Sequence, residues 1–259
     1  MSGEVDVNAL IGPYPFRHVP HPDPEVLVRV LAREQLRGAW VGHLPSAWYR
    51  DPAQGNELLF AALADHRALL QPVPSVRPDW PEWERALRDA ADRGAVAIRA
   101  YPPQWGMAPH DAAMHRLAAA CAEAGLPIVL TVRFEDLRQR NHLDVAGDLD
   151  PAAIRSLVRS SPRVRVVVTA AGRETIEFVH WGLAPAERER VWWDMSWIWG
   201  PPEDHLAHLF RTIGAARFVY GTQWPMRLTQ APRANLDLLP DELRGAELAD
   251  ADLIARGAR

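Results

Sequence analysis

Lysine is absent from this sequence, and its absence removes several kinds of active site. All 29 basic residues are arginine. Schiff-base catalysis, a pyridoxal phosphate anchor, a P-loop and a lysine-bridged pair of metal ions each need the primary amine of lysine. The sequence therefore excludes these four kinds of site.

Cysteine is almost absent as well. Cys121 is the one cysteine in 259 residues, so neither an internal disulfide nor a cysteine metal cluster can form. Its spacing from Met114, Leu117 and Ala118 matches the inner stripe of a helix. We therefore expect a buried, inert thiol and not a catalytic nucleophile.

Long apolar segments and an excess of positive charge are also missing. No run approaches the roughly 20 apolar residues that span a bilayer, and the first residues contain no apolar stretch of the signal-peptide type. The net charge is −4 and the pI about 6.2, which gives no basis for binding nucleic acid or an anionic membrane. We expect a cytoplasmic protein that binds a small anionic molecule, with no nucleic-acid or membrane partner. Self-association into a homo-oligomer stays open.

What the sequence does contain is a repeated order of apolar strand, loop and amphipathic helix. The predicted strands span residues 5–10, 38–41, 69–76, 96–100, 127–132, 164–170, 191–196 and 218–221. Predicted helices follow them, and Asp23-Pro24 and Asp150-Pro151 each supply an N-cap followed by a proline at the first helical position.

About eight strand and helix units in roughly 250 residues are typical of a (β/α)8 barrel. We therefore predict an α/β fold, a single TIM barrel that forms one domain over residues 1–259. An open, doubly wound sheet is the main alternative. No glycine-rich phosphate loop follows the first strand, which weakens a dinucleotide-binding version of that fold.

The strongest motif lies at the last predicted strand. Residues 217–225 read Arg-Phe-Val-Tyr-Gly-Thr-Gln-Trp-Pro, an apolar run that breaks at Gly221. This segment resembles the last barrel strand of the amidohydrolase family, in the branch that includes small-molecule decarboxylases and lactonases, where the strand typically reads Gly-Ser-Asp-aromatic-Pro. Asp194-Met-Ser196 is similar to the seventh strand of that family. The resemblance implies an amidohydrolase-like barrel whose chemistry lies at the C-terminal ends of the strands.

The resemblance also implies where metal ligands would lie, and those positions hold other residues. Asn8 and Leu10 stand where the first strand of the family has two histidines, Thr131 follows the fifth strand, and Thr169 or Ala170 takes the histidine position of the sixth. Gln223 replaces the aspartate. Zinc needs imidazole, thiolate or carboxylate donors, so we predict no metal in the central site and no cofactor.

Polar side chains at the predicted strand ends form a candidate binding site. Because side chains alternate along a strand, each strand directs selected residues into the mouth of the barrel. The candidates for substrate binding are Asn8, Arg17, Arg99, Tyr101, Arg133, Gln223 and Trp224. Arginine presents a planar fork to a carboxylate or phosphate, which indicates an anion site. Alternatively, Arg99 and Arg133 pair internally with Asp194, Glu135 or Asp136.

Three residues are candidates for proton transfer: His43, His142 and Asp194. Histidine titrates near neutral pH, and a buried carboxylate can be shifted toward it. A structural hydrogen bond is the alternative for each of the three.

Three functional hypotheses remain open. The first is a metal-independent hydrolase, or a lyase of the decarboxylase type, that acts on a small organic acid, with aromatic and cyclic acids included because of the resemblance. The second is a barrel without catalysis that serves as a ligand-binding or assembly protein, with its arginines satisfied internally. The third is a metalloenzyme with displaced ligands such as His18, His43 and His142.

Overall fold

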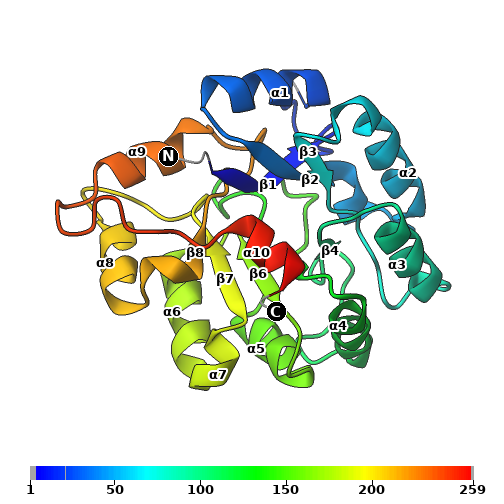
Figure 1. Cartoon of the computed structure of the whole chain (residues 1–259). Coiled ribbons are helices and arrows are strands. Elements are labelled where there is room, and N and C mark those ends of the chain that lie inside the picture. Colours follow the sequence, from blue (N-terminus) through cyan, green and yellow to red (C-terminus); the bar gives the residue numbers. More distant parts are fainter. Residues whose placement is uncertain (1–3, 21, 258–259) are drawn as a thin grey trace.

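The computed structural model describes residues 4–20 and 22–257. In this part of the chain eight parallel strands alternate with helices that surround them, which confirms the predicted barrel (Figure 1). The strands are β1 (Val5–Ile11), β2 (Gly38–His43), β3 (Leu70–Pro72), β4 (Ile98–Ala100), β5 (Ile128–Thr131), β6 (Val166–Thr169), β7 (Val191–Asp194) and β8 (Phe218–Val219).

The helices include those that the sequence predicts. They are α1 (Pro24–Arg33), α2 (Ala53–Ala62), α3 (Trp83–Asp92), α4 (Ala112–Ala124), α5 (Pro151–Ser160), α6 (Arg173–Gly182), α7 (Pro185–Arg188), α8 (His205–Thr212), α9 (Gln230–Asp237) and α10 (Ala251–Arg256), with 3-10 turns η1 (Leu44–Trp48), η2 (Ala64–His66) and η3 (Ala215–Arg217). The expected N-caps are confirmed: Asp23 accepts a hydrogen bond from the Val26 amide, and Asp150 accepts one from the Ala152 amide.

Backbone hydrogen bonds outside the strands close the barrel on the β3 side. The strands pair in two runs, β1 to β3 and β4 to β8. Between the runs, the Arg99 amide donates to the Pro74 carbonyl (2.9 Å) and the Val76 amide donates to the Arg99 carbonyl (3.2 Å). β3 is shorter than predicted because Pro72 and Pro74 have no amide hydrogen to donate to a ladder.

The second seam joins β1 to the segment after β8. The Val7 amide donates to the Tyr220 carbonyl (3.0 Å), and the Leu10 amide donates to the Trp224 carbonyl (2.8 Å). Trp224, a predicted substrate-binding residue, therefore closes the barrel through its backbone, and its side chain is buried.

The barrel interior is apolar toward the N-terminal ends of the strands. We call this set the apolar layer; it consists of Val5, Val7, Trp40, Val73, Ala97, Val129, Val167 and Val219. Ala251 and Ile254 of α10 pack against it, and α10 lies across the strands within the ring of helices (Figure 1). This helix therefore closes the N-terminal end of the barrel.

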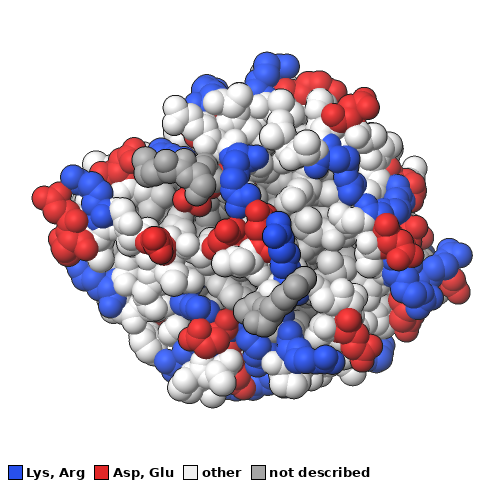
Figure 2. Space-filling model, viewed as in Figure 1, with Lys and Arg blue, Asp and Glu red and all other residues white. Residues whose placement is uncertain are grey.

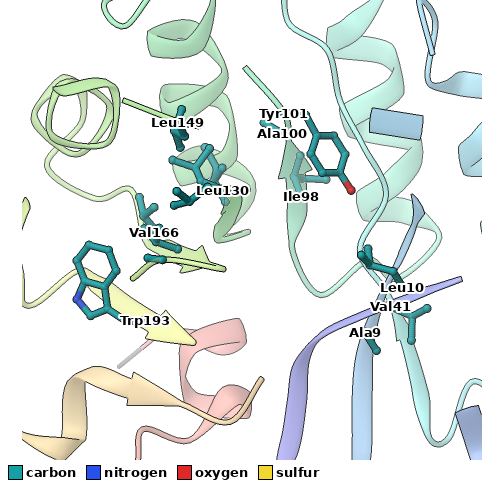
Figure 3. Packing of buried hydrophobic residues seen from close by; sticks show 14 of the residues in the cluster. Ala9, Leu10, Val41, Ile98, Ala100, Tyr101, Leu130, Leu149, Val166 and Trp193 are labelled. Atoms are coloured by element: carbon teal, nitrogen blue, oxygen red, sulfur yellow. The ribbon is translucent and has the colours of Figure 1, made fainter. Parts of the chain in front are cut away.

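A second apolar core fills the space around the strands. Leu130, Val166 and Trp193 belong to it and are buried (Figure 3). Cys121 lies in this core on α4, and burial raises the pKa of its thiol. The expectation of a buried cysteine is confirmed.

The surface carries charges of both signs. On the face shown in Figure 2, basic and acidic side chains are interspersed. Within the described ranges, no helix is both long enough and apolar enough to cross a bilayer.

Candidate active site

A second buried layer lies above the apolar one, at the C-terminal ends of the strands. On β2 to β6 and on β8, each member follows a member of the apolar layer by two residues, as alternation along a strand requires. On β7 the member follows Trp192 by two residues. On β1 an irregularity between Asp6 and Ala9 places Asn8 there instead. We call this set the polar layer; it consists of Asn8, Gly42, Ser75, Arg99, Thr131, Thr169, Asp194 and Gly221.

Asp194 is the acidic group of the polar layer and is fully buried. Its Oδ2 accepts hydrogen bonds from Asn8 Nδ2 (2.7 Å) and Ser196 Oγ (2.8 Å), and its Oδ1 accepts one from the Ala170 amide (2.8 Å). Burial raises the pKa of Asp194, although these hydrogen bonds and the charge of Arg99 lower it. A carboxyl group with a raised pKa can give up or take up a proton closer to neutral pH.

Arg99 is the basic group of the layer and has no exposed surface. Its Nη1 donates to Asn8 Oδ1 (3.1 Å) and Thr131 Oγ1 (3.3 Å). Its Nε and Nη2 are buried and have no hydrogen-bond partner among the described residues. Asn8 therefore connects the two charged groups, since its oxygen accepts from Arg99 and its nitrogen donates to Asp194.

Two glycines make room for these charged side chains. A Cβ at Gly42 would lie 3.3 Å from Arg99 Nε, and a Cβ at Gly221 would lie 2.6 Å from Asp194 Cβ and 2.9 Å from its Oδ2. Contacts under 3 Å cannot be accommodated without movement, so Gly221 fixes the position that Asp194 can take.

Two hydroxyl groups beside Arg99 also lack partners within the described structure. Ser75 Oγ and Tyr101 Oη are buried and make no well-formed hydrogen bond. Burial raises the pKa of Tyr101, while the charge of Arg99 and weak hydrogen bonding to Arg99 and Ser75 lower it. Asn56 fixes the Ser75 backbone through two hydrogen bonds of 2.8 Å. Arg99, Tyr101 and Ser75 thus form a cradle of unpaired polar atoms that suits an acceptor with several lone pairs.

Aromatic side chains from the loops cover the mouth of the barrel. We call Tyr14, Phe16, Trp48 and Phe134 the aromatic cover. The ring centroid of Trp48 lies 4.7 Å from that of Phe134 and 5.4 Å from that of Tyr14. The ring centroids of Phe134 and Tyr101 are 5.6 Å apart. These edge-on and tilted contacts are the favourable ones for aromatic rings. Because the polar layer beneath is fully buried, a ligand reaches it only when the cover moves.

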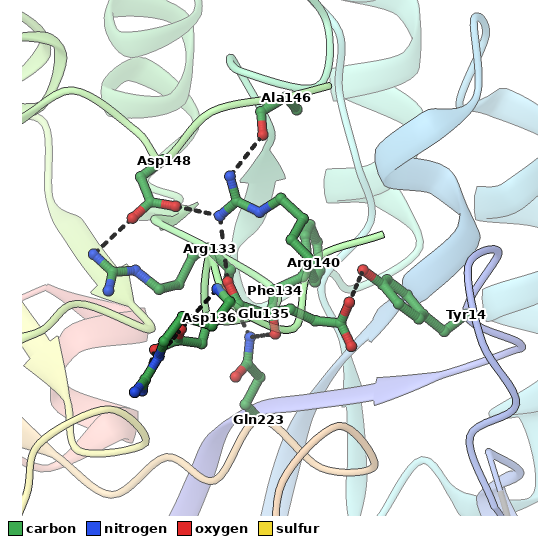
Figure 4. A network of polar contacts seen from close by, with 10 residues as sticks. Tyr14, Arg133, Phe134, Glu135, Asp136, Arg140, Ala146, Asp148 and Gln223 are labelled. Atoms are coloured by element: carbon green, nitrogen blue, oxygen red, sulfur yellow. Dashed lines mark hydrogen bonds and ion pairs between the residues drawn. The ribbon is translucent and has the colours of Figure 1, made fainter. Parts of the chain in front are cut away.

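Glu135 binds side chains at the outer side of the aromatic cover. It accepts a hydrogen bond from Tyr14 Oη (3.1 Å; Figure 4). It accepts a second hydrogen bond from Arg17 Nε (2.5 Å). Arg17, a predicted substrate-binding residue, is exposed and pairs with this carboxylate outside the cover. The structure does not bring Arg17 to Arg99.

Arg133 and Gln223 are engaged in other contacts. Arg133 pairs with Asp148 at 2.8 Å, whereas the sequence suggested Glu135, Asp136 or Asp194 as partners (Figure 4). Glu135 is occupied by Tyr14 and Arg17, and Asp136 pairs with Arg138.

The side-chain amide of Gln223 both donates and accepts hydrogen bonds. Its nitrogen donates to the Arg133 carbonyl (2.8 Å), and its oxygen accepts from Trp197 Nε1 (2.5 Å). Its backbone lies in the left-handed region with φ of 59°. The amide therefore ties together the loops that follow β5, β7 and β8.

The two candidate histidines do not contact Asp194. His43 points outward from β2, where its Nδ1 lies 2.9 Å from Ser46 Oγ and Gly55 of α2 leaves room for its ring. Burial lowers the pKa of His43 to about 4. His142 is exposed in the loop after β5, and its ring makes no hydrogen bond to another described residue.

The donor set does not fit a metal at the positions that the resemblance implies. Asn8, Thr131, Thr169 and Gln223 carry neutral groups that are hydrogen-bonded to one another or to neighbouring residues. Among residues 4–20 and 22–257, no three His, Cys, Asp or Glu side chains are grouped so that they could hold a metal ion. The displaced set of His18, His43 and His142 is not assembled in this structure.

The candidates for substrate binding did not include two residues of the polar layer. Ser75 and Thr169 follow members of the apolar layer by two residues, so strict alternation would have found them.

A model of the amidohydrolase family matches residues 13–255 of the chain. Because this match covers most of the sequence, the protein belongs to the amidohydrolase family. No curated protein matches the sequence.

Solved structures share the fold at low sequence identity. An amidohydrolase II gives a TM-score of 0.71 at 14% identity and covers 99% of this chain and 100% of its own. A dihydroxybenzoic acid decarboxylase from Polaromonas sp. JS666, with bound manganese and the inhibitor 2-nitroresorcinol, gives 0.66 at 11% identity, over 99% and 95%. A probable 2-pyrone-4,6-dicarboxylic acid hydrolase from Acinetobacter baumannii, with citric acid bound, gives 0.58 at 11%, over 92% and 91%.

Proposed function

We propose that the protein is a metal-independent hydrolase or a lyase of the decarboxylase type, and that its substrate is a small organic acid. The observation that carries the proposal is the cradle beside Arg99, where the Nε and Nη2 atoms of a fully buried guanidinium have no partner in the described structure. Buried charged groups are costly unless they are paired and hydrogen-bonded. A substrate carboxylate would supply the missing hydrogen-bond acceptors.

The shape of the unpaired edge favours a carboxylate. Nε and Nη2 share one edge of the planar guanidinium group, and such an edge binds a carboxylate through two parallel hydrogen bonds. Tyr101 and Ser75 add two hydroxyl donors at the same place. Aromatic side chains lie directly outside, so a ring attached to the carboxylate would stack against Tyr101 or Phe134.

Asp194 supplies the proton-transfer group in this proposal. It is linked to Arg99 through Asn8, and its raised pKa suits an acid or base that works near neutral pH. In a lyase step the protonated carboxyl group would give its proton to the carbon from which carbon dioxide leaves. In a hydrolytic step the carboxylate would accept a proton from water.

The structurally similar proteins support the substrate class. Their names describe a decarboxylase of a dihydroxybenzoic acid and a hydrolase of a cyclic dicarboxylic acid. Both substrates are small aromatic or cyclic acids, the kind of molecule that a cradle under an aromatic cover would hold.

A second candidate function is a barrel without catalysis that binds or stores a ligand. The closed aromatic cover and the internal pairing of Arg133 favour it. The two functions share the cradle and differ in the role of Asp194.

The test combines binding and turnover. Thermal stabilisation by small aromatic and cyclic acids is measured with and without EDTA, for the unchanged protein and for the Ser75→Ala, Tyr101→Phe variant. We expect stabilisation that survives EDTA and weakens in the variant, which removes two hydroxyl groups without exposing a charge. Stabilisation lost in EDTA would contradict metal independence.

Asp194→Asn then separates the two functions. If the variant binds the same acids and has lost hydrolysis or carbon dioxide release, Asp194 is the catalytic group. If the unchanged protein binds an acid but never turns it over, the non-catalytic function is correct.

A further inference from the structure

Arg227, in the turn after β8, carries a guanidinium that contacts two aromatic rings. It stacks on two tryptophans, with its central carbon 4.4 Å from the ring centre of Trp197 and 5.1 Å from that of Trp199. Trp197 is itself fixed, since its Nε1 donates to Gln223 and Arg133 stacks on the ring at 5.3 Å. The guanidinium is therefore held in place and does not move freely in solvent.

The held guanidinium has no acceptor. Its side chain makes no hydrogen bond or ion pair with any residue in 4–20 or 22–257, and its Nε is buried without a partner. Burial lowers the pKa of Arg227, and only the more distant charges of Asp194 and Asp136 favour its protonated form. The neighbouring Arg133 differs, because its Nη2 pairs with Asp148, although its Nε also has no partner among the described residues.

Arg227 lies on the β7 and β8 side of the barrel, because it stacks on Trp197 and Trp199, which follow β7. Arg99 lies on β4, and in a closed ring of eight strands β4 and β8 are opposite each other. Asp194 lies on β7, next to β8, and its charge acts on both guanidinium groups. A ligand that reached from Arg99 to Arg227 would therefore pass beside Asp194.

We propose that Arg227 is a second anion-binding residue of the same site and that the substrate is a small dicarboxylic acid, with one carboxylate on Arg99 and the other on Arg227. This inference rests on the proposed function, because it takes the cradle at Arg99 as the first carboxylate site. Arg227 would set specificity by favouring molecules that carry acidic groups at both ends.

The test compares benzoate with its three dicarboxylate relatives, phthalate, isophthalate and terephthalate, by direct binding titration in a buffer without other polyvalent anions. We expect at least one dicarboxylate to bind the unchanged protein roughly tenfold or more tightly than benzoate, since a charge-assisted pair is a strong hydrogen-bonding contact. Arg227→Met should remove that advantage and leave benzoate binding unchanged. Arg227→Lys should retain part of it, and Arg211→Met, which alters an exposed pair with Glu242, should have no effect.

The outcomes separate this inference from the proposed function. If benzoate binds but no dicarboxylate binds better, or if Arg227→Met leaves the preference intact, the second carboxylate site is wrong and the cradle stands. If no carboxylate binds the unchanged protein, the proposed function fails and the inference fails with it.

Discussion

The same strands contribute residues to two buried layers in the barrel interior, one apolar and one polar. In the apolar layer, Val129 and Val167 remove hydrocarbon surface from water, which stabilises the fold. Two residues further along the same strands, Thr131 and Thr169 belong to a layer that holds Arg99 and Asp194. Burying such ions costs several kcal/mol each before pairing, and the cradle leaves polar atoms unpaired. Stability accounts for the first layer, and the proposed ligand would account for the second.

The largest effect is expected when an aspartate is introduced into each layer in turn and the two losses of stability are compared. Val167→Asp places an unpaired charge in the apolar layer, so we expect a loss of more than about 4 kcal/mol in the free energy of unfolding and little soluble protein. Thr131→Asp places the same group at the position that Arg99 Nη1 contacts, and should lose less than about 2 kcal/mol. Soluble yield and urea unfolding measure both. Equal losses would mean that the two layers do not differ in the way described.

A smaller effect is expected from removing the charges of the polar layer. Arg99→Met leaves Asp194 buried without a nearby positive charge, which we expect to cost about 3 kcal/mol. Adding Asp194→Asn should restore part of that loss, because the double variant contains no buried charge at this place. Urea unfolding of the two single variants and the double variant gives the coupling energy directly. A double variant whose loss equals the sum of the single losses would show that Arg99 and Asp194 are not coupled.

The sequence predicted the two layers better than the loops around them. The strands, the N-caps at Asp23 and Asp150, and the inward positions of Arg99 and Asp194 follow from local periodicity and strand alternation, which sequence displays directly. Asn8 lies beside them because of the irregularity in β1, which alternation does not predict. Alternation should also have shown that His43 points outward, since its neighbour Gly42 belongs to the polar layer.

The loops were not predicted because irregular backbone decides their contacts. Gln223 and Ala170 have positive φ at non-glycine positions, and both orient groups around β7. The long connection after β5 brings Asp148 to Arg133, a pairing that neither propensity nor spacing indicates. Arg227 depends on the same kind of irregular turn.

Asp6 offers a third environment for a carboxylate, at the seam between β1 and β8. It is fully buried and accepts hydrogen bonds from the Thr222 amide (3.0 Å) and hydroxyl (2.5 Å). Burial raises its pKa to about 6. Because the folded state then holds its proton to a higher pH than the unfolded chain, the contribution of Asp6 to stability is present below pH 4 and is lost as pH rises toward and through 6.

The expected loss is about 3 kcal/mol between pH 3 and pH 7. Asp6→Asn has no such titration, so the difference in unfolding free energy between the two proteins should change by about this amount over that range. The difference isolates Asp6 from His43, whose lowered pKa of about 4 acts in the opposite direction, because stability is lost there as pH falls from about 6.5. A difference that does not vary with pH would show that Asp6 titrates normally in the fold.

The smallest effect is expected outside both layers, at His142. Its side chain is exposed and makes no hydrogen bond to another described residue, so His142→Ala should change the free energy of unfolding by less than about 0.5 kcal/mol. Ligand binding at the cradle should also be unchanged, because the aromatic cover lies between the exposed loop and the polar layer. Turnover is the informative measurement. If His142→Ala lost turnover while stability and binding stayed the same, the loop after β5 would have to fold over the mouth during catalysis, and the proton would come from His142 and not from Asp194.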